Sequence, residues 1–495
     1  MCCGSTGAPS CGRLGTAGPS FTSSSLALPN RAPLLPRTVL IPLIVACALF
    51  MEQMDATVIA TSLPMIAADL HESPIALKLA LTSYLVSLAV FIPISGWMAD
   101  RFGSRTIFRA AIAVFVGGSV LCGLSGSLGA FVVARFVQGM GGAMMVPVGR
   151  TVILRSVSKV ELVQALNYLT IPALIGPIVG PPLGGLITTY LHWRWIFFIN
   201  VPISVVGIWL ATRFIDDLRS DAPPPLDWPG FAFSAVGLSA TMLGLATAGR
   251  HLVSGRASAL CIVVGVLALG AYFVHARRAT HPLLRLELFK IQTFRIGVLG
   301  GSLFRAGIGA LPFLLPLFLQ LGFGLTPFES GLLTCTAAAG SMCMKTLSRK
   351  VLRRFGFRAV LVGNIAFASA SLMAIALFSA STPHGAIALT LLIGGVFRSL
   401  QFTSLNAISY ADIDHTDVSQ ASSISSAVQQ LSLGMGVTIG AFALQASSAL
   451  QGHTTLVASD FRPAFVFIGV LSLCSLRFLR QLPADAGAEI SGRSA

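Results

Sequence analysis

Ionisable side chains interrupt two apolar stretches of the sequence. Glu52 and Asp55 lie three residues apart, on nearly one face of the helix expected there, and Arg135 lies several residues inside the second stretch. A charge at bilayer depth is costly unless it pairs or meets water. Protonation switches a carboxylate between charged and neutral forms, and a nearby guanidinium changes the pH at which this happens. We therefore predict an embedded acid–base cluster that couples transport to protons, with a static buried ion pair as the alternative.

Two further arginines lie within apolar stretches later in the sequence. Arg305 and Arg398 are both embedded, and Gln401 and Asn406 lie near the second. Guanidinium groups around a central cavity favour anions, because their donors match a carboxylate. They predict an anionic substrate, such as a carboxylate metabolite or its metal chelate. The alternative is that they pair with helix carbonyl groups or with Glu329.

The composition is that of a membrane protein. The chain has 495 residues, of which 54% are hydrophobic and 10% charged, with a mean hydropathy of +0.82. A soluble chain of this length needs more surface charge. The net charge is +15, but the basic residues are spread between the apolar blocks and do not form one basic patch. This distribution argues against a nucleic-acid partner. The nine cysteines show neither metal-ligand nor disulfide-framework spacing, so we expect no metal site.

The apolar blocks are long enough to cross a bilayer, and fourteen of them can be counted. We therefore predict an all-α, polytopic membrane protein with 14 transmembrane helices. The 33 Lys and Arg residues fall mostly in alternate connections, together with both ends of the chain. Because basic residues favour the cytoplasmic side, both termini are expected inside the cell. The outer connections hold only Lys78, Arg194, Arg250, Arg256 and Arg462.

The order of the blocks indicates two similar halves separated by an extra pair. A proline-rich segment at 216–228 and a basic stretch at 275–295 bracket the middle pair. Loops expected at 96–109 and 345–360 hold equivalent places and share a basic cluster beside Phe-Gly. The predicted divisions are a disordered cytoplasmic tail at 1–36, a six-helix half at 37–215, a linker with two extra helices at 216–295, a second six-helix half at 296–482 and a cytoplasmic tail at 483–495.

Four segments of the sequence follow one another in a recognisable order. They contain Asp55, Thr57 and Pro64; Gly96, Asp100, Arg101, Gly103 and Arg105; Arg135, Gln138, Gly139 and Gly142; and Gly176, Pro177, Gly180, Pro181, Gly184 and Gly185, followed by WRWIFFINVP at 193–202. These four segments resemble the major facilitator superfamily, specifically its fourteen-helix drug:proton antiporter branch. The sequences GGAMMVPVGR, GSMCMK and LPFLLPLFLQLGFGLTPFESG look like the MdtD-type multidrug resistance proteins of that branch.

The resemblance implies a fold of two six-helix major facilitator halves plus a central helix pair. It implies that Arg135 assists proton coupling and that Asp55 serves the proton or the substrate. It also implies that the Gly96–Arg105 segment latches the halves, with Asp100 docking at a helix start near Ser419 to Ser423. The Gly176–Gly185 segment marks antiporters, although a glycine face that only packs helices is the alternative. Ala60 stands where relatives often carry Asn, and the 345–358 loop lacks the acid of its counterpart.

These observations predict a proton-coupled exporter of small molecules, an antiporter of the multidrug efflux type, in a bacterial inner membrane. The alternatives are an importer of the same fold, an exporter of anionic metabolites or metal chelates, and a non-transporting membrane sensor. We expect no enzymatic activity and no cofactor other than the proton gradient. The expected partners are the lipid bilayer, protons and a small substrate, with a monomeric transport unit. Some relatives also work with a periplasmic adaptor.

Overall fold

The computed structural model describes residues 37–156, 162–217, 225–248, 254–280, 282–414, 417–453 and 455–487. Within these ranges every regular element is helical, in agreement with the predicted all-α class. The predicted tail at 1–36 lies outside the described residues, as does the end of the tail at 483–495.

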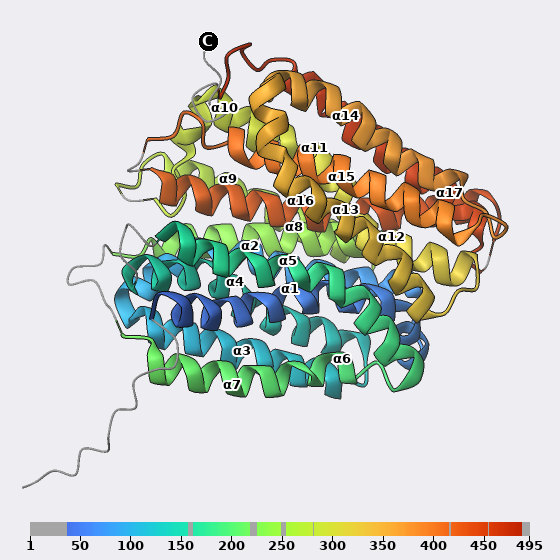
Figure 1. Ribbon diagram of the computed structural model, residues 1–495, viewed down its shortest axis with the longest axis horizontal. Helices are drawn as coiled ribbons and strands as arrows, with labels where there is room; N and C mark the ends of the chain where they lie inside the picture. Colours follow the sequence, from blue (N-terminus) through green and yellow to red (C-terminus); the bar gives the residue numbers. More distant parts are fainter. Residues whose placement is uncertain are drawn as a thin grey trace, which may run out of the picture.

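The first half of the chain forms a bundle of long antiparallel helices (Figure 1). Helix α1 packs along α5, while α4 packs against both α2 and α3. We call the two ends of the bundle the Arg37 end and the Asp69 end, after the first and last residues of α1. The elements are α1 (Arg37–Asp69), η1 (Pro74–Leu77), α2 (Lys78–Phe102), α3 (Ser104–Leu124), α4 (Leu128–Ser156), α5 (Leu162–Tyr190), α6 (Trp195–Phe198) and α7 (Asn200–Phe214).

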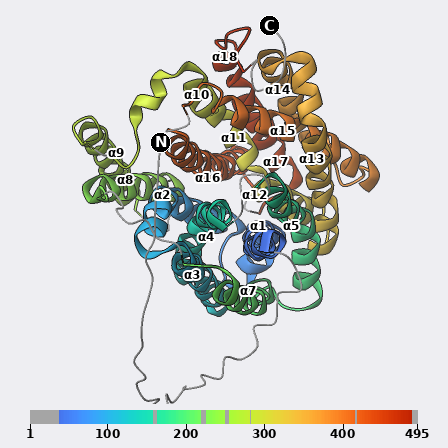
Figure 2. The ribbon, with the colours of Figure 1, turned by 60° about the vertical axis from the view of Figure 1, so that its left-hand side comes forward.

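A pair of helices follows and lies at the side of the bundle (Figure 2). Helix α8 (Trp228–Thr247) packs against α2 and α16, and α9 (Gly255–Ala276) packs mainly on α8. Leu260, Val266 and Leu267 of α9 are well exposed, as expected for a helix that faces lipid.

The second half repeats the helical bundle, and its first long helix is interrupted. Residues Gln292–Gly322 form one apolar span that contains two π-helical turns and Pro312 and Pro316. The elements are η2 (Leu286–Lys290), α10 (Gln292–Arg295), η3 (Ile296–Gly300), α11 (Gly301–Gly309), α12 (Leu311–Leu317), η4 (Phe318–Gly322), α13 (Pro327–Phe355), α14 (Phe357–Ala374), η5 (Ile375–Leu377), α15 (His384–Ile408), α16 (Val418–Leu450), α17 (Ala458–Cys474) and α18 (Leu476–Leu479).

Twelve helical segments of the described chain are long and apolar enough to cross a membrane. Helices α5 and α13 are not among these twelve, although each has 29 residues. Helix α5 contains four prolines, while α13 carries many small, hydroxyl and basic residues. The structure thus establishes an all-helical membrane protein with twelve candidate spans.

The loops expected at 96–109 and 345–360 are almost entirely helical, so this expectation was wrong. Helix α2 continues to Phe102 and α3 begins at Ser104, while α13 continues to Phe355 and α14 begins at Phe357. A single glycine makes each turn, Gly103 with φ +94° and Gly356 with φ +79°. Glycine adopts positive φ without the Cβ clash that other residues meet. Basic residues that looked like loop residues therefore lie on helix ends.

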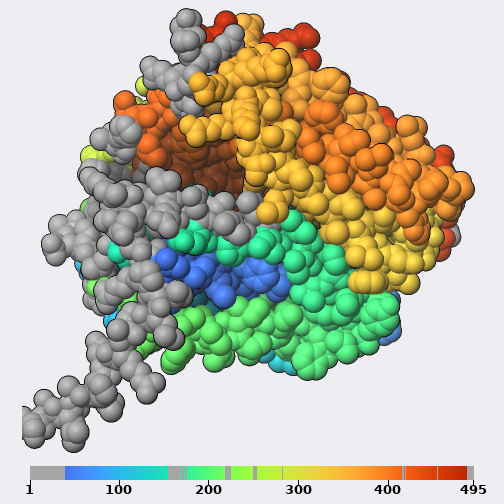
Figure 3. All heavy atoms as spheres, in the orientation of Figure 1, coloured from blue at the N-terminus to red at the C-terminus, as the bar shows by residue number. Residues whose placement is uncertain are grey.

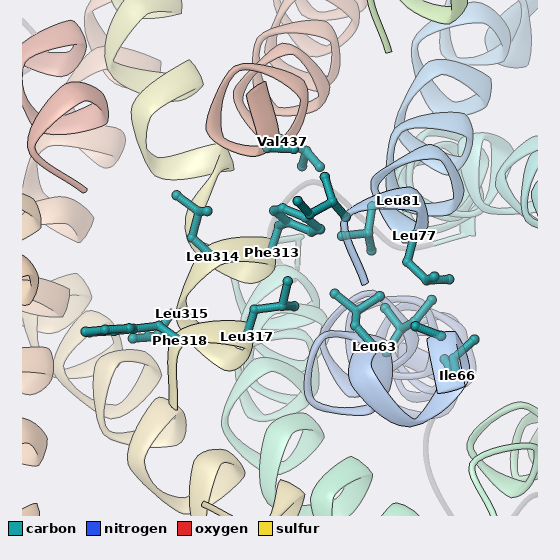
Figure 4. Packing of buried hydrophobic residues seen from close by; sticks show 14 of the residues in the cluster. Leu63, Ile66, Leu77, Leu81, Phe313, Leu314, Leu315, Leu317, Phe318 and Val437 are labelled. Carbon is teal, nitrogen blue, oxygen red and sulfur yellow. The ribbon is translucent and has the colours of Figure 1, made fainter. Parts of the chain in front are cut away.

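The two halves meet in an apolar cluster toward the Asp69 end (Figure 4). Leu63 and Ile66 of α1 lie close to Leu77 and Leu81, and α12 supplies Phe313 and neighbouring leucines. Helix α13 also packs along α5, and α16 packs along α2. These contacts fix the two halves relative to each other and leave a cavity between them.

Candidate functional site

Asp55 and Arg135 form an ion pair inside the first half. Asp55 lies on α1 and Arg135 on α4, and Arg135 Nη1 is 2.7 Å from Asp55 Oδ2. Both are buried, with residue exposures of 3% and 1%. A charge pair this deep is stable only where further hydrogen bonds satisfy both groups.

Neutral polar side chains supply those hydrogen bonds. Gln138 accepts from Arg135 Nη1 at 2.6 Å and donates to Asp55 Oδ1 at 2.9 Å, so it bridges both charges. Asn200, at the start of α7, donates to the same Asp55 oxygen at 3.0 Å. Its amide also lies 2.9 Å from Ser119 Oγ of α3. Four helices therefore hold one carboxylate in a single geometry.

An aromatic ring covers the guanidinium. The centre of the Tyr84 ring lies 4.3 Å from Arg135 Cζ, within cation–π range. The sequence prediction did not include Tyr84, Ser119, Gln138 or Asn200 among the site residues. Gln138 belongs to the same sequence segment as Arg135 and could have been given this role, because it lies three residues later on one helix face. Ser119 and Tyr84 give no comparable indication, since both are common in apolar helices.

Glu52 lies one helical turn before Asp55 and does not join this network in the described structure. It is 8% exposed, and its Oε2 atom is buried without a hydrogen-bond partner. A neutral carboxyl group or an amide fits such surroundings at lower cost than a charge. The predicted three-residue cluster is therefore present as one ion pair and one separate acid.

A cavity of about 380 Å³ lies between the halves. Figure 3 shows the surface hollowed beside α13, in amber, with orange-red atoms of the second half at the floor of the hollow. Thr57, Ala60 and Thr61 of α1 and Pro177 and Pro181 of α5 line one side. The other side comes from α11, α12, α13 and α15. Asp55 and Arg135 are not among its lining residues.

The structure separates the two predicted cavity arginines. Arg398 on α15 lines the cavity, whereas Arg305 on α11 does not. Arg305 donates to the carbonyl oxygens of Gly297 and Val298 and to Asn406 Oδ1. Its contacts thus include the carbonyl pairing considered as the alternative. Glu329 contacts neither arginine, because it forms a capping box with Thr326 at the start of α13.

The glycines of the Gly176–Gly185 segment bring helices together in two directions. Cβ atoms added at Gly180 and Gly184 would meet α1 at Thr57 and Val58, so this face packs α5 closely on α1. One at Gly185 would meet the backbone of α13 at Pro327. Gly176 also faces α1. Pro177 and Pro181 of the same helix line the cavity.

The second contact of α5 closes the Asp69 end of the interface. Gly331 of α13 lies against Pro181 and Pro182, so its own Cβ would meet the Pro181 carbonyl oxygen. The Phe328 amide donates to Thr189 Oγ1 at 3.2 Å. Gln320 Nε2 donates to the Thr61 carbonyl oxygen at 2.8 Å. The halves therefore touch at backbone distance on this side of the cavity.

The predicted latch segment lies at the Arg37 end. Gly96, Asp100 and Arg101 lie in the last two turns of α2, and Asp100 is half-buried. Arg105 Nη1 is 3.4 Å from the Ile215 carbonyl oxygen. The side chain of Ser419, at the predicted docking point, lies outside the described residues.

A second carboxylate from the linker closes the turn at Gly103. Asp217 accepts hydrogen bonds from the amide and hydroxyl of Thr106, both at 3.3 Å, at the start of α3. A carboxylate there is favoured by the partial positive charge of the helix start. A Cβ at Gly103 would collide with the Asp217 carboxylate. Glycine at this position is therefore required by both its φ and its neighbour.

Asp227 anchors the middle pair outside the membrane-spanning segments. Its carboxylate accepts from the Gly230 amide at 2.9 Å and the Leu283 amide at 3.1 Å, and it contacts His275 Nε2 at 2.7 Å. Burial opposes charge on Asp227, but these hydrogen bonds outweigh it and hold the pKa of the carboxyl below its ordinary value. In the described ranges, no group of three or more His, Cys, Asp or Glu is placed to hold a metal ion.

Two helical bundles around a central cavity, with an ion pair buried inside the first bundle, are the architecture of a polytopic membrane transporter. The chain belongs to the Major Facilitator Superfamily, whose profile matches residues 45–409 and again 297–494. Relatives named "Putative multidrug resistance protein MdtD" occur in Salmonella heidelberg and Salmonella typhimurium. Each is 39% identical over 81% of this chain and 85% of its own length.

Solved structures share the fold at low sequence identity. A D-xylose–proton symporter matches with a TM-score of 0.68 and 14% identity, covering 91% of this chain and 99% of its own. An auto-inhibited POT family peptide transporter matches with a TM-score of 0.66 and 16% identity, covering 90% and 98%. These likenesses support the arrangement of the helices and nothing about the substrate.

Proposed function

We propose that this protein is a proton-coupled exporter of small molecules, an antiporter of the multidrug efflux type. The names of the MdtD relatives support efflux. The observation that carries proton coupling is the buried Asp55–Arg135 pair, because it is a titratable charge that the fold keeps from water.

Helix α1 connects the ion pair to the cavity. Asp55 faces Arg135, while Thr57 and Thr61, two and six residues later, line the cavity. One rigid helix therefore presents one side to the charge and the other to the substrate. Protonation of Asp55 removes the charge that Arg135 binds, and α1 is then free to shift relative to α4. A shift of α1 changes the cavity wall directly.

Alternating access requires the contacts at the Asp69 end to open while those at the Arg37 end close. The close crossing of α5 and α13 supports opening at the Asp69 end. Because the two helices touch through their backbones at Gly185 and Gly331, these contacts would separate together. We propose that residues 37–215 and 296–482 move as two halves and that 216–295 links them through α8 and α9. Helices α5 and α13 complete a count of fourteen spans.

The proposed topology follows the basic residues. The protein lies in a bacterial inner membrane. Both termini and the Arg37 end are on its cytoplasmic side, and the Asp69 end faces the periplasm. The protein uses the proton gradient and no cofactor, and the transport unit is one chain. A periplasmic adaptor, as used by some relatives, would have to contact the Asp69 end.

Transport by purified protein in liposomes tests the proposal. Transport of a cationic dye, ethidium, and of an amphipathic carboxylate, 1-naphthaleneacetate, is measured with an imposed pH gradient, with the gradient collapsed, and for Asp55→Asn. We expect gradient-driven accumulation by the wild type and its loss in Asp55→Asn. Asp69→Asn is the matched control, because Asp69 lies on the same helix in an exposed ion pair with Arg194. Accumulation by Asp55→Asn equal to wild type refutes proton coupling through this pair.

The importer and sensor alternatives predict different outcomes. An importer accumulates substrate in counterflow from the opposite side, so measuring direction in vesicles of known orientation separates it from an exporter. A sensor shows no flux in either direction with folded protein.

A further inference from the structure

Two basic side chains share the wall of the central cavity. Arg398 of α15 and Lys345 of α13 both line it. Arg398 is 8% exposed, and Lys345 is exposed. The sequence prediction assigned Lys345 to a loop, whereas α13 carries it into the cavity wall.

Neighbouring contacts place these two cations within about two helical turns of each other along α13 and α15. Ser399 Oγ donates to the Ser341 carbonyl oxygen at 2.8 Å, which aligns α15 with α13 at this point. Arg398 precedes Ser399, and Lys345 lies one helical turn after Ser341, about 6 Å further along α13. Both side chains therefore line the same cavity from neighbouring helices.

Neither cation has an anionic partner among the described residues. Arg398 makes one hydrogen bond there, to Ser371 Oγ at 3.4 Å, although a guanidinium has five donors. Its Nη1 atom folds back over Gly394, where a Cβ would displace it. No carboxylate occurs among the residues that line the cavity. Two positive charges thus face a cavity with no negative charge in its wall.

The rest of the wall is apolar or carries hydroxyl groups. Leu311, Leu315, Met342 and Phe402 supply apolar surface, while the hydroxyl groups are those of Thr57, Thr61, Thr334, Ser341, Ser399 and Thr403. A volume of about 380 Å³ fits a small organic molecule. A compact, fully hydrophilic anion would leave this apolar surface unmatched.

We propose that the cavity binds amphipathic organic anions. A carboxylate is held between Lys345 and Arg398, and an aromatic or aliphatic body lies against Leu311, Leu315 and Met342. This rests on the proposed function, since it names the substrate class for the same cavity. Charge-assisted hydrogen bonds from a guanidinium and an ammonium to one carboxylate provide the recognition.

Binding to purified protein tests the proposal without any transport. Isothermal titration calorimetry in a neutral detergent compares 1-naphthaleneacetate with 1-naphthaleneacetamide, which have nearly the same shape. We expect the carboxylate to bind the wild type about tenfold more tightly than the amide, as hydrogen bonds to charged groups imply. Equal affinities, or no binding of the carboxylate by folded protein, overturn the proposal.

Single replacements identify the groups responsible. Lys345→Gln and Arg398→Gln should each weaken carboxylate binding about fivefold to tenfold and leave amide binding unchanged. Lys350→Gln is the matched control, because Lys350 is exposed on α13 and does not line the cavity. An equal loss in Lys350→Gln would mean that net charge alone attracts the ligand, and would overturn the site.

The test separates this proposal from the proposed function. Failure of gradient-driven flux with intact carboxylate selectivity removes proton-coupled export and leaves the anion site in place. Gradient-driven flux without carboxylate selectivity in binding supports proton-coupled export and rules out the anion site. Since Lys345 is the more exposed cation, Lys345→Gln keeps the test decisive if Arg398→Gln fails to fold.

Discussion

Removing one member of the Asp55–Arg135 pair leaves the other charge buried. The two side chains are 2.7 Å apart and almost fully shielded from solvent. Breaking a buried pair by removing one partner costs about 3–5 kcal/mol, because an uncompensated charge remains. Replacing both partners leaves no charge. We therefore expect Asp55→Asn with Arg135→Gln to be less destabilising than the sum of the two single replacements.

The surroundings of the pair predict which single replacement is worse. After Arg135→Gln, Asp55 Oδ1 keeps two amide donors, Gln138 at 2.9 Å and Asn200 at 3.0 Å. After Asp55→Asn, the new amide either turns its own donor toward those two or turns its oxygen away from Arg135. We expect a loss of about 4–5 kcal/mol for Asp55→Asn and about 3 kcal/mol for Arg135→Gln.

Reversible unfolding in mixed micelles with increasing dodecyl sulfate gives the four free energies of unfolding that this cycle needs. The expected coupling energy between positions 55 and 135 is about 2–3 kcal/mol. Single effects that add within about 0.5 kcal/mol in the double variant would show that the pair is not an energetic unit, and would refute the reasoning.

Three further predictions concern the turns and crossings that position the site. Gly103→Ala should lower the free energy of unfolding by about 1–2 kcal/mol, because φ is +94° there, while Gly96→Ala, with open space, should not. Gly331→Ala should cost about 1–3 kcal/mol and increase labelling of cysteines placed at the Asp69 end, whereas Gly363→Ala should do neither. Since the folded-state pKa of Asp227 is lowered, its contribution is present above its unfolded pKa and is lost as pH falls through the folded value. Melting temperatures of wild type and Asp227→Asn should therefore converge as the pH falls below about 4; a gap unchanged at low pH contradicts this.

The membrane class, the family and the Asp55–Arg135 pairing could be predicted from the sequence. A charge inside an apolar block is costly unless it is paired, so an acid and an arginine that are both at bilayer depth are expected to form an ion pair. The superfamily profile confirms the family. The roles of the individual residues stay predictions.

Other features depend on how helices rotate and how far they extend. Lys345 looked like a loop residue because basic residues follow it, yet α13 continues for ten more residues. Arg305 and Arg398 look equivalent in sequence, but one turns toward carbonyl groups and the other toward the cavity. Which way a side chain faces depends on how its helix packs against elements that are distant in the chain. A single sequence does not give this packing.

The separation of Asp55 from the cavity limits how protons and substrate can be coupled. In the proposed function they do not compete for one carboxylate, because Asp55 is buried and does not line the cavity. The proposed coupling is therefore conformational, through α1 and the α5 glycine face packed on it. Linkage requires that protonation change substrate affinity by the factor by which substrate changes proton affinity. Asp55→Asn, a neutral stand-in for the protonated acid, should therefore change the affinity for 1-naphthaleneacetate without abolishing binding. Abolished binding in folded Asp55→Asn would place the carboxylate at the substrate and contradict indirect coupling.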